Sequence, residues 1–251
     1  MERPRIALLN AALDPADTAR NFRREVDADL VEFHVAGGDV PDDLDVDAAI
    51  LTGSQASVYW DDAWIEPTRE WIAAADARDL PILGVCFGHQ LLAAALGGAV
   101  EPMGEYEIGY RTVRKVADRR SPPDARATTD GSRERDGSDP LFAGIGERFT
   151  VFTTHSDAVT ALPPGADLLA ENDYGVHAFR RANAYGVQFH PEYDTHTAEL
   201  VTRRKDDLPT DRTDAVLAGI TPENYAAACE AKRLFENFTA FVASTSPVAA
   251  D

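Results

Sequence analysis

Apolar runs alternate with amphipathic stretches along the first part of the chain. Four runs, 5–10, 30–35, 48–54 and 79–86, have the length and composition of buried strands. Between them, 18–30 and 61–79 carry apolar residues at helical spacing. Strands that alternate with helices predict a parallel sheet with right-handed crossovers and helices on both faces.

The pattern changes after residue 98. Six short strand-like runs follow, separated by turn residues: 98–103, 108–116, 148–155, 166–172, 175–181 and 184–190. They predict antiparallel hairpins added to the parallel sheet. The predicted fold class is therefore α/β, an open, mostly parallel, doubly wound sheet with added antiparallel strands.

One domain is expected over residues 1–244. Within it, residues 117–139 are almost free of apolar side chains and predict an exposed, mobile polar loop, with a docking element as the alternative. A polar connection follows residue 204, and 222–244 predicts a strongly amphipathic helix. Residues 245–251 are expected to form a flexible tail.

Charge narrows the possible partners. The 251 residues carry 43 acidic and 24 basic side chains, a formal net charge of −19. Such a field repels phosphate backbones and anionic membranes, which argues against nucleic-acid and lipid partners. The acidic residues are scattered, and only three basic residues are lysines: Lys115, Lys205 and Lys232. This pattern is typical of a halophilic protein, with an ordinary acidic protein as the alternative.

The expected location is the cytoplasm. The first residues lack the basic stretch and apolar core of a signal peptide, and no run reaches 18 uncharged apolar residues. Two cysteines, Cys86 and Cys229, are too few for a disulfide framework and indicate a reducing compartment.

Cys86 is the first candidate for chemistry. It lies between Gly84 and Gly88, where a predicted strand meets a predicted helix. A nucleophile on such a sharp turn needs small neighbours, and the helix N-terminus favours the thiolate. The alternative is a buried, inert cysteine, and this motif alone does not decide between them.

His190 and Glu192 are the candidates for proton transfer. They flank Pro191, which disfavours a helix at His190. In an extended segment, positions two apart face the same way, so Glu192 can orient His190 and stabilise its imidazolium. A thiolate needs such a partner, and the combination of both motifs favours catalysis over a capped strand end.

The segments GVCFGHQLLAAALGG (84–98) and GVQFHPE (186–192) together resemble the class I glutamine amidotransferase family. The resemblance implies a flavodoxin-like class I glutamine amidotransferase fold and a Cys86–His190–Glu192 triad. It also implies hydrolysis of glutamine to glutamate and ammonia through a γ-glutamyl thioester, without metal or organic cofactor. The segments 105–113 and 139–159 look most like stand-alone members related to the glutaminase domain of GMP synthase.

The resemblance extends to other site residues. It implies an oxyanion hole made by the backbone N–H groups of Phe87 and Ser54, although TGSQAS stands where the family usually has Gly-Gly-Pro. Five residues are expected to contact the substrate: Gly53, Gln90, His155, Ser156 and Asp157. Gln90 facing solvent, and a merely polar turn at 155–157, are the alternatives.

The remaining histidines suggest no site. Cys86 and His89 have a metal-like spacing, but two ligands do not make a metal site and no matching pair occurs elsewhere. His34, His177 and His196 have no evident partners in the sequence and are expected to be ordinary residues.

Three functions are compatible with these features. The leading one is a glutaminase that supplies ammonia to a separate synthase subunit, because the chain contains no ATP-pyrophosphatase phosphate loop. The second is a γ-glutamyl hydrolase that acts on another amide or peptide without a partner. The third is a non-catalytic regulatory or binding module, against which the intact triad argues.

Overall fold

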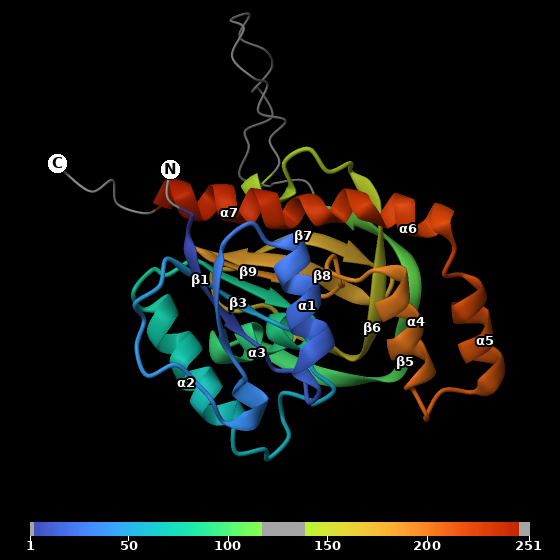
Figure 1. The fold of residues 1–251 in the computed structure, drawn as a ribbon, viewed down its shortest axis with the longest axis horizontal. Coiled ribbons are helices and arrows are strands. Elements are labelled where there is room, and N and C mark those ends of the chain that lie inside the picture. The colour runs from blue at the N-terminus through green and yellow to red at the C-terminus, as the bar shows by residue number, and fades with distance from the viewer. Residues whose placement is uncertain (1–2, 117–138, 246–251) are drawn as a thin grey trace, which may run out of the picture.

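The computed structural model describes residues 3–116 and 139–245. The predicted loop 117–139 and the predicted tail 245–251 fall, except for their residues 139 and 245, outside the described residues. Nine strands of the described chain form one sheet, in the order β2-β1-β3-β4-β9-β8-β7-β5-β6 (Figure 1). The strands are β1 Arg5–Leu9, β2 Asp29–Phe33, β3 Ala48–Leu51, β4 Ile82–Val85, β5 Ala99–Lys115, β6 Arg148–Ala161, β7 Asp167–Asn172, β8 Gly175–Arg181 and β9 Ala184–Val187.

Seven α-helices lie in the described chain. They are α1 Pro15–Glu25, α2 Ile65–Asp76, α3 Phe87–Ala95, α4 Thr195–Arg203, α5 Thr210–Ala218, α6 Pro222–Ala228 and α7 Arg233–Thr245. Short 3₁₀ helices occupy Val35–Gly37, Pro140–Phe142 and Cys229–Lys232. None of the helices in this part of the chain is long and apolar enough to cross a bilayer.

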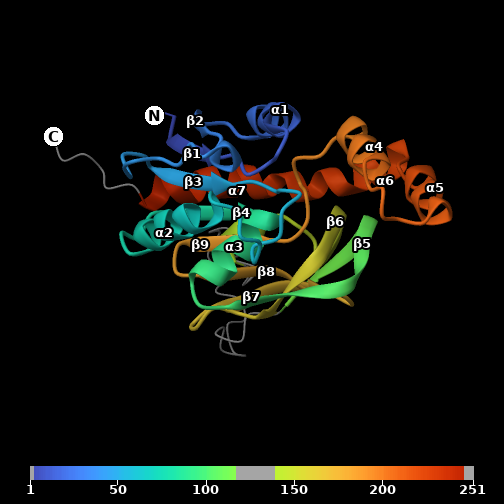
Figure 2. The ribbon, with the colours of Figure 1, turned by 90° about the horizontal axis from the view of Figure 1, so that it is seen from below.

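Apart from its edge strand β2, the parallel half of the sheet is buried on both faces. Strands β2, β1, β3 and β4 run parallel, as the alternating pattern predicts. Strand β9, from a run predicted to belong to an antiparallel hairpin, lies parallel to β4 and extends this part of the sheet. Alternate residues of β1 face opposite cores: Ile6 and Leu8 pack with α1 and α7, whereas Ala7 and Leu9 pack with α2 and α3. Figure 2 shows these two helical layers on either side of the strands.

The second half of the sheet is antiparallel, with two departures from the predicted runs. Runs 98–103 and 108–116 belong to one strand, β5, with a bulge between Pro102 and Glu107 opposite β6. The bulge includes Gly104, whose φ of 77° is a conformation that glycine adopts readily. Of run 184–190, only β9 is strand; it pairs antiparallel with β8 and parallel with β4.

The C-terminal region is more broken than the sequence predicts. The amphipathic run 222–244 forms α6, a 3₁₀ turn and α7 instead of one helix. The polar connection after residue 204 contains α5, a helix with no buried residue. Helices α4, α5 and α6 lie together beside the end of the β5–β6 ribbon (Figure 2).

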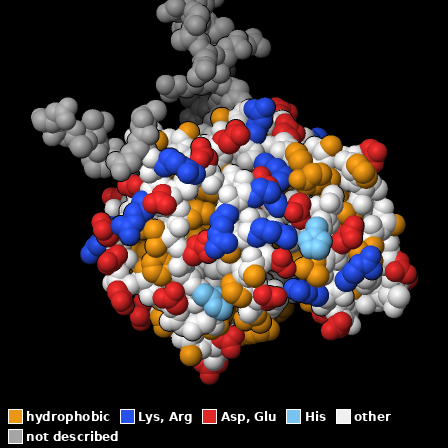
Figure 3. Space-filling model, viewed as in Figure 1, with side chains coloured by type: hydrophobic (Ala, Val, Ile, Leu, Met, Phe, Trp, Pro, Cys, Tyr) orange, Lys and Arg blue, Asp and Glu red, His pale blue; other side chains and the backbone are white. Residues whose placement is uncertain are grey.

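Acidic and basic side chains are interspersed on the face that carries α1 (Figure 3). The arginines of α1 are all paired with carboxylates: Arg23 with Glu32 at 2.5 Å, Arg24 with Asp194 at 2.6 Å, and Arg20 with Asp17 at 3.4 Å. These basic groups therefore do not form an unpaired cationic surface.

Candidate active site

Cys86 sits on a strained turn at the carboxyl end of β4. Its φ of 54° and ψ of −106° lie outside the regions that side-chain-bearing residues ordinarily occupy. Such a conformation costs about 1–3 kcal/mol and persists only where the surroundings enforce it. Helix α3 begins at the next residue, Phe87, so the sulphur lies at a helix N-terminus.

The glycines on either side of Cys86 permit this turn. A Cβ at Gly84 would lie 2.4 Å from the carbonyl oxygen of Gly88, and a Cβ at Gly88 would lie 2.2 Å from that of Leu51. Both approaches are too close for any side chain. The predicted need for small neighbours is therefore met, because α3 packs directly on the backbone of β3 and β4.

His190 and Glu192 form a buried ion pair. His190 Nδ1 lies 2.7 Å from Glu192 Oε1, and the residues are 5% and 1% exposed. The extended segment expected here is wrong, because the N–H of Tyr193 approaches the carbonyl of His190 at 3.5 Å across a turn. The two side chains meet because the turn folds Glu192 back onto the ring.

His190 and Cys86 meet beside Gly53. A Cβ at Gly53 would lie 2.9 Å from His190 Cε1 and 3.6 Å from Cys86 Cβ, so both side chains crowd the same point. The Nε2 atom of His190 is buried without a hydrogen bond of ordinary geometry. The sulphur of Cys86 also lies 3.9 Å from the carbonyl oxygen of Thr154, a long contact.

Electrostatics favour the charged form of His190. Burial by itself lowers the pKa of the imidazole. The charges of Glu192 and Cys86, with hydrogen bonding to both, outweigh burial and raise this pKa to about 10. His190 is therefore positively charged at neutral pH beside the sulphur.

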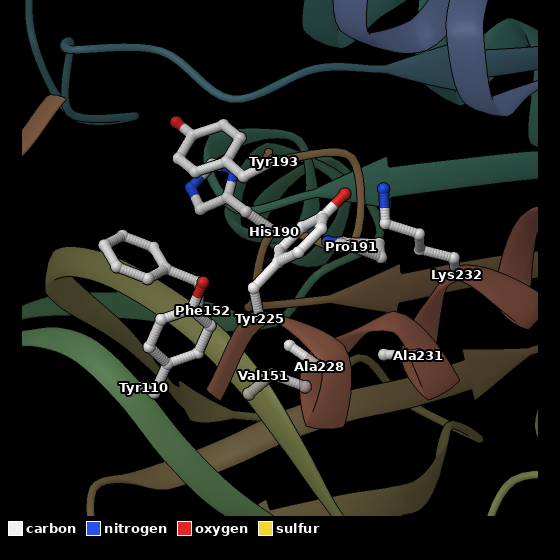
Figure 4. A pocket seen from close by; sticks show the side chains of 10 residues that line it. All are labelled: Tyr110, Val151, Phe152, His190, Pro191, Tyr193, Tyr225, Ala228, Ala231 and Lys232. Carbon is white, nitrogen blue, oxygen red and sulfur yellow. The ribbon is translucent and has the colours of Figure 1, made fainter. Parts of the chain in front are cut away.

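Tyr193 covers the other face of His190. The two rings stack with centroids 4.0 Å apart and planes inclined by 17° (Figure 4). Burial and the negative charges of Glu192 and Cys86 raise the pKa of Tyr193 well above its usual value, so its hydroxyl stays protonated. A hollow adjoins these rings, lined by Tyr110, Val151, Phe152, His190, Pro191, Tyr193, Tyr225, Ala228, Ala231 and Lys232. Cys86 is not among the residues that line this hollow.

Two backbone donors near Cys86 are available. Among the described residues, none accepts a hydrogen bond from the N–H of Phe87 or of Ser54. Gly53 and Ser54 follow directly after Thr52, at the carboxyl end of β3. Ser54 lies outside the left-handed region, so a serine at this position causes no strain.

Gln90 and Asp157 belong to one hydrogen-bond network. Gln90 is 3% exposed, and its Nε2 donates to the Asp157 carbonyl at 3.0 Å and to Gln188 Oε1 at 3.1 Å. The alternative of a solvent-facing Gln90 is therefore wrong. The Asp157 carboxylate accepts from Ser57 Oγ at 2.6 Å and from the Tyr59 hydroxyl at 2.9 Å.

Both ring nitrogens of His155 have partners on β5 or β6. Its Nδ1 bonds to the Asp157 carbonyl at 2.9 Å, and its Nε2 lies 2.7 Å from Glu107 Oε2. Ser156, between His155 and Asp157, is half-buried. Of the five expected substrate contacts, Gly53 borders Cys86. The side chains of Gln90 and His155 bond to the carbonyl of Asp157, and the carboxylate of Asp157 bonds to Ser57 and Tyr59.

Glu107 and His177 were not predicted as site residues. His177 is not an ordinary residue, since its Nε2 lies 3.0 Å from Glu107 Oε2, and Asn172 Nδ2 donates to Glu107 Oε1 at 2.6 Å. Burial by itself raises the pKa of Glu107, but hydrogen bonds from His155 and His177 outweigh it and lower the pKa to about 2. No local motif connects these residues, because pairing of distant strands brings them together.

The cluster Glu107–His155–His177 contains the types of side chain that bind metals, with the potential ligand atoms within 4.8 Å of one another. Its Oε2–Nε2 distances of 2.7 and 3.0 Å are hydrogen-bond lengths, shorter than the ~3.3 Å between two ligands of a tetrahedral zinc ion. The present geometry is thus that of a hydrogen-bonded cluster. His89, the other metal candidate, is fully buried beside Phe179, and burial lowers its pKa to about 3.

Comparison with known proteins places these features in a family. The family model described as glutamine amidotransferase class-I matches residues 19–204. A glutamine-hydrolyzing GMP synthase from Thermomicrobium roseum is 39% identical over 144 residues, which is 57% of this chain but only 23% of that protein. One subunit of the glutamine-hydrolyzing GMP synthase from Halobacterium salinarum is 37% identical over 162 residues, which is 63% of this chain and 73% of that protein.

The fold matches a solved structure as well. A glutamine amidotransferase from Thermotoga maritima superposes with a TM-score of 0.73 at 20% sequence identity. The match covers 95% of this chain and 99% of the other. The predicted α/β fold with its mixed sheet is thereby confirmed.

Proposed function

The chain belongs to the glutamine amidotransferase class-I family, and from this we propose that it hydrolyses the side-chain amide of glutamine to glutamate and ammonia. The observation that carries the proposal is the convergence of Cys86 and His190 over Gly53, with Glu192 bound to the far side of the imidazole. A thiolate, a proton-transfer group and a third group that orients it are what acyl transfer requires.

The first half of the reaction forms a thioester. The Cys86 thiolate attacks the carbonyl carbon of the glutamine amide, and the negative charge moves to the carbonyl oxygen. The tetrahedral species collapses by cleavage of the C–N bond, and His190 gives its Nε2 proton to the departing ammonia. Glu192 stabilises the imidazolium before this transfer, in agreement with the raised pKa of His190.

The second half restores the enzyme. Neutral His190 accepts a proton from water while the water oxygen attacks the thioester carbonyl. Cleavage of the C–S bond releases glutamate and regenerates the Cys86 thiolate beside the charged imidazole. Since water supplies both the new oxygen and the proton, no external reductant or cofactor is consumed.

We propose that the N–H groups of Phe87 and Ser54 stabilise the oxyanion in both halves. Each such preorganised donor is worth roughly 3–4 kcal/mol of transition-state stabilisation. Neither N–H is taken up by an acceptor among the described residues, which leaves both free for this role. Gly53 and Gln90 complete the proposed surroundings of the substrate, while Asp157 holds Gln90.

We also propose that a separate synthase subunit consumes the ammonia. Support comes from the Halobacterium relative, whose name describes one subunit of a GMP synthase. Residues 1–244 would form a single glutaminase domain of such an assembly, as the one shared sheet suggests. Two free cysteines agree with a cytoplasmic location.

Glutamine hydrolysis by the purified protein tests the proposal. Ammonia and glutamate release is measured for wild type, Cys86→Ala and the control Cys229→Ala, since the second cysteine lies in the 3₁₀ turn between α6 and α7. Wild type and Cys229→Ala are expected to be active and Cys86→Ala inactive. Equal rates for all three overturn the mechanism, and cleavage of other γ-glutamyl amides without glutamine turnover favours a γ-glutamyl hydrolase instead.

A further inference from the structure

We propose that His155 is a positioning residue. Its ring is fixed by Glu107 and holds the backbone of Asp157. Asp157 in turn connects the loop after β3, which carries the proposed donor Ser54, to helix α3, which begins directly after Cys86. This inference rests on the proposed role of Cys86 as the nucleophile. It assigns to His155 a role different from substrate contact, and it assigns a role to Glu107, which no motif in the sequence singles out.

Strand pairing sets the starting geometry. Glu107 is the direct cross-strand partner of His155, and it follows the bulge that begins after Pro102, the partner of Asp157. The bulge places extra residues on β5 opposite this short part of β6 and turns the Glu107 side chain inward, where its exposure is 0%. The carboxylate is therefore delivered by the fold to the Nε2 side of His155.

The hydrogen-bond partners fix the ring on both sides. The Asp157 carbonyl can only accept, so Nδ1 of His155 must carry a hydrogen. At the opposite side of the ring, Nε2 lies 2.7 Å from Glu107 Oε2, so the imidazole is held at both nitrogens. His177 and Asn172 satisfy the rest of the Glu107 carboxylate, at 3.0 and 2.6 Å, so Glu107 cannot swing away.

Asp157 then connects two separate parts of the candidate site. Its carbonyl accepts from Gln90, which lies in the first turn of α3, four residues after Cys86. Its carboxylate accepts from Ser57 and Tyr59, which follow Ser54 in the loop after β3. Through these bonds, a shift of Asp157 would move the Ser54 N–H relative to the Cys86 sulphur.

Two substitutions of His155 separate positioning from structural support. His155→Asn places an amide N–H where Nδ1 lies and keeps the bond to Asp157, but abandons Glu107. His155→Gln reaches Glu107 with its amide and abandons the Asp157 carbonyl. Steady-state glutaminase rates, thermal unfolding and hydrogen exchange of the backbone over 54–60 and 87–90 are measured for both variants and wild type.

We expect His155→Gln to lose more activity than His155→Asn, and His155→Asn to lose more thermal stability than His155→Gln. His155→Gln should lower kcat/KM by about 10- to 100-fold, the effect of a misplacement approaching 1 Å, and speed exchange over 54–60 and 87–90. His155→Asn keeps the bond to Asp157 but lacks the Glu107 anchor, so it should lose less kcat/KM than His155→Gln does. It should unfold at the lower temperature, because it leaves a buried carboxylate short of a donor.

Equal activity losses, a larger loss for His155→Asn, or unchanged exchange in His155→Gln overturn the proposal. So does a stoichiometric metal ion in the purified protein that His155→Asn releases, since the cluster would then be a metal site. Exchange is independent of turnover, so an inactive wild type refutes the proposed function while exchange still decides this inference.

A variant at less buried positions tests the same connection if the His155 variants fail to fold. Ser57→Ala combined with Tyr59→Phe removes both hydroxyl donors to Asp157 from a half-buried and an exposed position. The proposal expects this variant to fold and to lose kcat/KM by at least about fivefold, with faster exchange over 54–60. Wild-type activity and exchange in this variant contradict the proposed connection.

Discussion

Gly53→Ala is a direct perturbation of the contact between Cys86 and His190. The new methyl group would lie 2.9 Å from His190 Cε1, whereas carbon atoms in favourable contact are about 3.5–4.0 Å apart. The imidazole or the loop must therefore move by at least about 0.6 Å. Tyr193 stacks on the imidazole at 4.0 Å and Glu192 holds its Nδ1, so the ring cannot move without disturbing one of them.

The expected loss follows from this displacement. A misplacement of about 1 Å costs about 100-fold in rate, so a shift of roughly 0.6 Å should lower kcat/KM by about 10- to 100-fold. This corresponds to about 1.4–2.7 kcal/mol of transition-state stabilisation. Overpacking should also destabilise the fold, by about 1–3 kcal/mol.

The assay compares glutamine hydrolysis and thermal unfolding of Gly53→Ala with those of Gly146→Ala. A Cβ at Gly146 would lie 3.4 Å from the Arg148 carbonyl oxygen and from Glu230 Oε1, and neither residue contacts Cys86 or His190. The control should retain wild-type kcat/KM. If Gly53→Ala also retains wild-type kcat/KM and unfolding temperature, the argument that Cys86 and His190 converge over Gly53 is refuted.

Four further outcomes are expected. Glu192→Gln removes the negative charge that helps to raise the pKa of His190 to about 10, so the basic limb of the kcat/KM–pH profile should move to lower pH; an unmoved limb contradicts the assignment. Because the pKa of His190 is raised in the folded protein, this residue stabilises the fold fully below about pH 6.5 and progressively less up to about pH 10. The unfolding temperature should therefore fall less across this window for Glu192→Gln than for wild type. Ser54→Ala keeps the backbone N–H and should stay within about threefold of wild type in kcat. Ser54→Pro removes this N–H and should lower kcat by about 10²–10³-fold, so equal effects of the two substitutions would exclude Ser54 as an oxyanion donor. With a net charge of −19, the protein should gain activity and unfolding temperature in molar KCl as screening weakens self-repulsion, and full stability at low salt argues against the halophilic interpretation.

The order of the elements was largely determined by the sequence itself. Hydrophobic periodicity is a local property, and it correctly predicted β1, β3, β4 and the helices between them, together with the antiparallel character of the later strands. Cys86 between two glycines was also a local signal, because the strain of its turn and the close approach of α3 act within a few residues. Breaks within amphipathic runs, such as the 3₁₀ turn before α7, left no clear local signal.

The buried polar network was decided only by the tertiary structure. Glu107 meets His155 and His177 across 48 and 70 residues of chain, because β5 pairs with β6 beyond a bulge whose position depends on register. Asp157 likewise joins Ser57 and Gln90 from opposite sides of the site. Hydrophobic patterning specifies which face of a strand is buried, whereas the partners of a buried charge depend on strand register and on distant segments, which no local pattern encodes.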